Sequence, residues 1–193
     1  MKLSGRDSEH LIRFLEGLSG AVQLYNRSVQ NGSFIEAACL CASIIDASLR
    51  IGVILKHQLD TESNELFTDM LYQGASDKPL SEKCIYDRAL KNGVIDQGLH
   101  DTLYRLYDDR NRVIHRYIIS EITTNEVLMI VQSYEDVRKR VAAQVNDLEQ
   151  LQTQRGVGMT VRNTGQKQAA SVTQMADAKH GNSTLAEKLK SND

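Results

Sequence analysis

The sequence predicts an all-α fold: a bundle of five to six helices with a flexible polar C-terminal tail. Large apolar residues recur at spacings of three or four up to about residue 150, which is the period of one helix face. Proline, which disrupts helix interiors, occurs once, at Pro79. Sustained alternation of apolar and polar residues, the mark of strands, is hard to find.

The first helix is expected to begin after Asp7 or Ser8, either of which can cap it, and to end before the Asn31-Gly32-Ser33 turn signal. The second is expected over 34–59. It is apolar on nearly all sides, which is typical of the central helix of a core.

This second helix is the longest apolar stretch, but it contains Asp46 and Arg50. Charges are costly at the centre of a bilayer, so we interpret it as a buried helix and expect no membrane span. The simplest interpretation of Asp46 and Arg50, four residues apart, is an ion pair within the helix or at an interface.

The remaining helices are expected over 62–73, 80–92, about 96–115 and 126–151, with Thr124 or Asn125 capping the last one. Residues 1–152 therefore form one helical domain. After residue 152 the chain turns polar, with six Lys/Arg against three Asp/Glu and few large apolar residues. We expect this tail, 153–193, to be disordered in isolation because it cannot bury enough apolar surface.

The bulk composition excludes some classes of protein. The formal charge of −2 does not favour indiscriminate nucleic-acid binding, so a site for a polyanion has to be a local patch. The three cysteines, at positions 39, 41 and 84, are too few for a disulfide framework, and their number is odd. We interpret them as buried thiols and expect a cytoplasmic protein.

The segment Arg110–Tyr117 (RNRVIHRY) carries the densest group of chemically capable side chains. Arginine grips phosphate oxygens with a planar fork, and histidine exchanges protons near neutral pH. RNA supplies its own nucleophile, the 2′-hydroxyl, so a cation and one proton shuttle can cleave it. Metal-ligand spacings and phosphate-binding glycine loops are absent from the sequence, so we expect no metal and no cofactor.

The spacing within this segment restricts the geometry. Asn111 and His115 are four residues apart and share a face of an ideal helix, whereas Arg110 and His115 lie about 140° apart around its axis. A helix end near His115, or a second subunit that supplies another copy of the segment, would relieve this. A dimeric site is therefore expected.

The segment resembles the R-x4-6-H signature of HEPN domains, which Arg110, Asn111 and His115 match. With Tyr117 it is similar to the R-x4-H-x-Y form of HepT-like toxins, which are paired with MNT-type nucleotidyltransferase antitoxins. The resemblance would cover about 7–152, and its specific part is these eight residues.

The resemblance implies a HEPN-like homodimer that acts as a metal-independent endoribonuclease, as a toxin or phage-defence effector. It implies that His115 is the general acid/base, Arg110 the phosphate clamp and Asn111 an aid to orientation. Tyr117 corresponds to the tyrosine that the antitoxin AMPylates. Arg112 and Arg116 would support RNA binding.

Alternatives remain at each of these positions. His115 could be structural, Tyr117 could be packing, and Arg110 could pair with Asp46 or another acid. Asp46 could instead hold Arg110 or His115 within the site. At the level of the whole chain, the rivals are a catalytically inactive HEPN-like module for RNA binding or regulation, and an interaction protein whose function lies in the basic tail.

Overall fold

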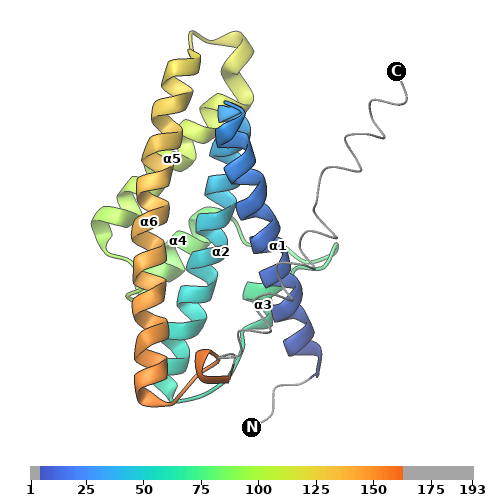
Figure 1. Cartoon of the computed structure of the whole chain (residues 1–193), viewed down its shortest axis with the longest axis vertical. Helices are drawn as coiled ribbons and strands as arrows, with labels where there is room; N and C mark the ends of the chain where they lie inside the picture. Colours follow the sequence, from blue (N-terminus) through green and yellow to red (C-terminus); the bar gives the residue numbers. More distant parts are fainter. Residues whose placement is uncertain (1–4, 163–193) are drawn as a thin grey trace.

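The computed structural model describes residues 5–162, and this part of the chain is helical and contains no strand (Figure 1). The all-α prediction is therefore confirmed. The α-helices are α1 (Gly5–Gln30), α2 (Phe34–Thr61), α3 (Thr68–Leu71), α4 (Glu82–Lys91), α5 (Gln97–Arg116) and α6 (Thr124–Arg155). The 3-10 turns are Tyr117–Ile119 and Thr160–Arg162.

Helix α2 is the centre of the bundle, as its all-round apolar surface predicted. It packs against α1, α3, α4, α5 and α6, and in Figure 1 it lies between α1 and α6. In length and composition it is the one helix among the described residues that could cross a membrane, and 67% of its apolar window is buried inside the bundle. Most of the apolar surface of α2 is therefore covered by other parts of the bundle.

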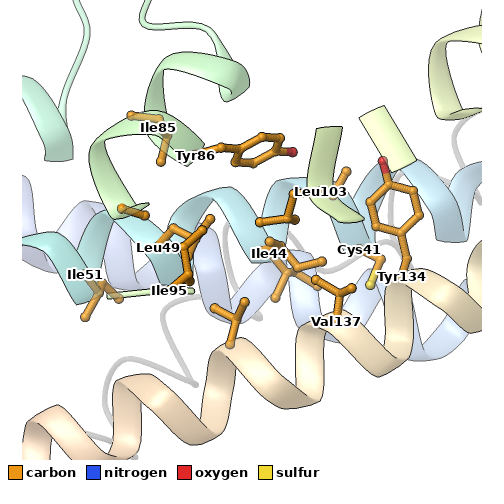
Figure 2. Close-up of a cluster of buried hydrophobic side chains, with 14 of the residues drawn as sticks. Cys41, Ile44, Leu49, Ile51, Ile85, Tyr86, Ile95, Leu103, Tyr134 and Val137 are labelled. Carbon is orange, nitrogen blue, oxygen red and sulfur yellow. The ribbon is translucent and has the colours of Figure 1, made fainter. Parts of the chain in front are cut away.

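The core lies between α2, α4, α5 and α6 and includes two fully buried tyrosines, Tyr86 and Tyr134 (Figure 2). A buried phenol needs a hydrogen-bond partner. The Tyr134 hydroxyl donates to the main-chain oxygen of Leu106 at 2.8 Å, which ties α6 to α5. Cys41 is buried in this core, as expected, while Cys39 and Cys84 are half-buried, and all three thiols are free.

The helix expected over 62–73 is the main error of the prediction. α2 ends with Glu62 in a left-handed conformation (φ 51°), and only Thr68–Leu71 forms a helical turn. The buried amide of Gln58 donates to the main-chain oxygen of Glu65 at 2.8 Å, so a tertiary contact satisfies a group that a helix would use internally.

Two expected helix starts also shift. α1 already begins at Gly5, before the proposed caps Asp7 and Ser8. The N-cap of α6 is Thr123, one residue before the positions we expected, and it forms a capping box with Glu126. The reciprocal pairing of the two side chains with the two main-chain NH groups selects Thr123 over Thr124.

Two buried glutamines, Gln58 and Gln152, lie near the C-terminal ends of α2 and α6 and close this end of the bundle. α6 continues to Arg155, beyond the predicted domain boundary, and Gly156 (φ 68°) turns the chain back. Gln152 Nε2 then donates to Gln58 Oε1 at 2.9 Å, and the same oxygen accepts from the main-chain NH of Met159 at 3.0 Å. The part of the expected tail up to residue 162 is thus packed on the bundle, and 163–193 lies outside the described residues.

Candidate functional site

Helix α5 carries the signature from Arg110 to Arg116 and exposes only part of it. Its N-cap is Asp96, whose carboxylate accepts from the Leu99 NH at 2.7 Å. Residues at helical spacing form its buried face: Leu99, Leu103, Leu106, Arg110 and Val113. The helix ends at Arg116, so His115 lies in its last turn, which is one of the two arrangements that the spacing left open.

Arg110 points into the bundle. Its side chain is 11% exposed, and Nη1 donates to Glu82 Oε1 at 2.5 Å. Nη2 donates to Asn111 Oδ1 at 3.0 Å, and the guanidinium lies 5.0 Å from the centre of the Tyr107 ring. Burial alone would lower the pKa of Arg110, but the hydrogen bond and the charge of Glu82 outweigh it and the pKa is raised. Arg110 is therefore a permanently charged member of an internal ion pair.

Glu82 is the site residue that the sequence did not reveal. The cap of α4, Ser81, accepts from the Cys84 NH and places Glu82 in the first turn of the helix. Besides Arg110, Glu82 accepts from the Tyr86 hydroxyl at 3.0 Å. Its only sequence signal was an acid next to a serine cap, and that pattern does not tell which distant arginine it meets.

Asp46 pairs within α2, and no described hydrogen bond or ion pair joins it to Arg110 or His115, the alternative that the sequence left open. Its Oδ2 accepts from Arg50 Nε at 2.7 Å, which confirms the simpler prediction of an ion pair within α2. Arg50 also donates to the main-chain oxygen of Met70 at 3.2 Å. Burial raises the pKa of Asp46, and the charge of Arg50 opposes this rise.

His115 and Asn111 lie one turn apart on the part of α5 that faces outward. His115 is exposed and makes no hydrogen bond or ion pair within residues 5–162. Asn111 is half-buried, and its oxygen is held by Arg110. Arg110 therefore fixes the amide that stands one turn before the histidine, although its own charge is paired with Glu82 inside the bundle.

Tyr117 lies beyond the end of α5 and is half-buried. Its hydroxyl is 3.3 Å from Thr124 Oγ1 at the start of α6. It helps to line a pocket of about 520 Å³ between the α1–α2 turn and α6. The pocket residues are Gly32, Ser33, Phe34, Ile35, Glu36, Tyr117, Thr124 and Val127.

The same end of the molecule carries exposed apolar side chains. Ile118 and Ile119, in the 3-10 turn that follows α5, are 94% and 81% exposed. Ile114, in the last turn of α5, is 43% exposed. Exposed apolar side chains that adjoin one another can form a surface that another chain covers.

Comparisons with known proteins found no match: no family model, no curated protein and no solved structure matches the chain. The HEPN resemblance therefore rests on the eight-residue segment and its place in the bundle. Among residues 5–162, no cluster of three or more His, Cys, Asp or Glu side chains has the arrangement of a metal site.

Proposed function

We propose that this protein is a HEPN-type, metal-independent endoribonuclease that works as a homodimer in the cytoplasm, as a toxin or phage-defence effector acting on cellular RNA. The observation that carries the proposal is the setting of His115. It stands exposed in the last turn of α5, with Asn111 one turn before it and Arg112 and Arg116 beside it. A proton shuttle, a polar orienting group and cations are thus gathered on one accessible helix end.

The chemistry needs no group beyond these side chains and the RNA. Deprotonation of the ribose 2′-hydroxyl lets its oxygen attack the adjacent phosphorus, and the bond to the 5′-oxygen breaks. Histidine in its neutral form takes the first proton, and in its protonated form it supplies one to the departing oxygen. The products are a 2′,3′-cyclic phosphate and a 5′-hydroxyl.

The two faces of α5 support a homodimer. Arg110 is buried and His115 is exposed on one continuous helix, so one subunit does not aim both at the same phosphate. Two copies of His115 would divide the base and acid roles if the helix ends met. Ile118 and Ile119 provide the exposed apolar surface that such an interface needs.

The proposed partner is a nucleotidyltransferase antitoxin of the MNT type, which would modify Tyr117. The support is the resemblance together with the position of the tyrosine, two residues after His115 and against Thr124. An added nucleotide at this hydroxyl would place a bulky anion beside the RNA site and block it.

One observation favours a second candidate, a catalytically inactive HEPN-like module that binds RNA or regulates a partner protein. The Arg110 charge is neutralised by Glu82 and largely buried, so the expected phosphate clamp is engaged inside the fold. A domain that kept the signature only for packing would show the same pairing.

The test is cleavage of total RNA in EDTA by the full chain and by His115→Ala, Asn111→Ala and His57→Gln. His57 lies near the C-terminal end of α2, outside the signature, and serves as the histidine control. We expect wild type and His57→Gln to leave 2′,3′-cyclic ends, and His115→Ala to lose at least about a hundredfold in rate. If dimeric wild type leaves tRNA, rRNA and mRNA intact, the binding module replaces the nuclease.

A further inference from the structure

We propose that Arg105, Arg112 and Arg116 form a phosphate-binding stripe on the exposed face of α5, which takes the backbone of a single RNA strand. This inference rests on the proposed function and deepens it. It moves phosphate binding from Arg110, the arginine of the signature, to three arginines around it.

The three positions share one face. Seven residues separate Arg105 from Arg112 and four separate Arg112 from Arg116, so their directions around the axis differ by no more than about 40°. Along the axis they are about 10 Å and 6 Å apart. All three are exposed, and the stripe runs to the end of the helix.

The charges of the stripe are available to a ligand. Arg105 and Arg116 make no ion pair within the described part of the chain. Arg112 meets Asp109 at 3.7 Å with 47% and 33% of the two side chains exposed, a weak surface contact that a phosphate can replace. Arg110, by contrast, is fixed to Glu82 at 2.5 Å.

Two other acids of α5 near the stripe already have partners. Asp108 pairs with Lys83 of α4 at 3.1 Å. Asp101 accepts from the Gln97 amide at 2.7 Å. Arg105 and Arg116 therefore keep charges that no ion pair within residues 5–162 neutralises, although the formal charge of the chain is −2.

The arginines of the stripe lie where they can hold a phosphate next to His115. Arg112 and His115 differ by about 60° around the axis and about 4.5 Å along it, so a phosphate held by Arg112 lies beside the imidazole. Arg116 follows His115 directly in sequence. Arg105 is nearly three turns away and would hold a phosphate further along the strand.

The experiment measures how the affinity for RNA depends on salt. The probe is a single-stranded oligonucleotide with 2′-O-methyl riboses, which lacks the nucleophile and is not cleaved. Each phosphate contact on a single strand contributes about 0.7 to the slope of log K against log salt. The combined variant Arg105→Ala, Arg112→Ala, Arg116→Ala should therefore have a slope shallower by about 2.

The matched control replaces three arginines outside α5, Arg13, Arg27 and Arg155, and should keep the wild-type slope. A stripe variant that keeps the wild-type slope overturns the proposal, as does equal loss in the control or a wild type that does not bind the probe. Folding of each variant is checked by circular dichroism, and the full chain is used throughout so that residues 163–193 contribute equally.

Parallel cleavage of unmodified RNA separates this inference from the proposed function. A shallower salt slope in the stripe variant, with no cleavage by wild type, supports the stripe and contradicts the proposed nuclease activity. Cleavage by wild type with an unchanged slope in the stripe variant overturns the stripe and keeps the enzyme.

Discussion

The two faces of α5 use the same residue type in opposite ways. On the inner face Arg110 is 11% exposed and paired with Glu82, among leucines that are almost fully buried. On the outer face Arg105 and Arg116 are exposed and make no ion pair within residues 5–162. The sequence signature alone does not distinguish a buried arginine from an exposed one, whereas the 3.6-residue period of the helix does. Changes on the inner face should therefore cost stability, and changes on the outer face should cost binding.

The largest effect is expected from Glu82→Ala. It leaves the Arg110 charge buried without its carboxylate and removes the acceptor of Tyr86, which should cost about 3–5 kcal/mol of unfolding free energy. The matched control is Asp108→Ala, which breaks the more exposed pair with Lys83 and should cost about 1 kcal/mol or less. Urea unfolding measures both, and equal losses would show that the Glu82–Arg110 pair is no more than a surface contact.

Next in size is a comparison of two neighbours on α5, Leu103→Ala and Arg105→Ala. Leu103 is fully buried, and removing it should cost about 2–5 kcal/mol. Arg105 is exposed, and its loss should stay within about 0.5 kcal/mol while it weakens RNA binding. A destabilising Arg105→Ala would place this residue in the fold instead of the phosphate stripe.

The fold was largely predictable from the sequence because its signals are local. The apolar surface of α2 and the turn at Asn31-Gly32-Ser33 each act within a few residues. Where the prediction failed, a distant contact decided the outcome. Gln58 reaches Glu65 and Met159, which keeps the segment after α2 out of a helix and carries order past residue 152.

In the candidate site, too, the features set by local spacing were predictable and those set by distant contacts were not. The shared face of Asn111 and His115 follows from their spacing, and the end of α5 near His115 is one of the two arrangements that this spacing left open. The partner of Arg110 was not predictable, because Glu82 lies 28 positions earlier and Asp46 was an equally plausible acid. The roles of His115, Asn111 and Tyr117 stay predictions until RNA is tested.

A smaller effect is expected at the start of α5. The Asp96 carboxylate caps the Leu99 NH, and Asp96→Ala should cost about 1 kcal/mol. Asp96→Asn keeps an oxygen at the cap and should recover most of this. If both variants lose the same amount in urea unfolding, the charge of Asp96, which lies near the helix dipole and 3.7 Å from Arg140, provides the stabilisation and the hydrogen bond does not.

The smallest effect concerns the outer edge where α4 meets α5. Hydrogen bonds from His100, at 2.9 Å, and from Tyr104, at 2.7 Å, lower the pKa of Asp87 below its ordinary value of 3.8. A lowered carboxyl pKa stabilises the fold above the unfolded value, and this contribution disappears as the pH falls through the folded pKa. Asp87→Asn should therefore be less stable than wild type near pH 7 by a few tenths of a kcal/mol, because the pair is partly exposed. In urea unfolding this difference should shrink as the pH falls below 3.8 and vanish once the pH is below the folded pKa, and a difference that persists there would assign it to packing between α4 and α5 instead of to the charge.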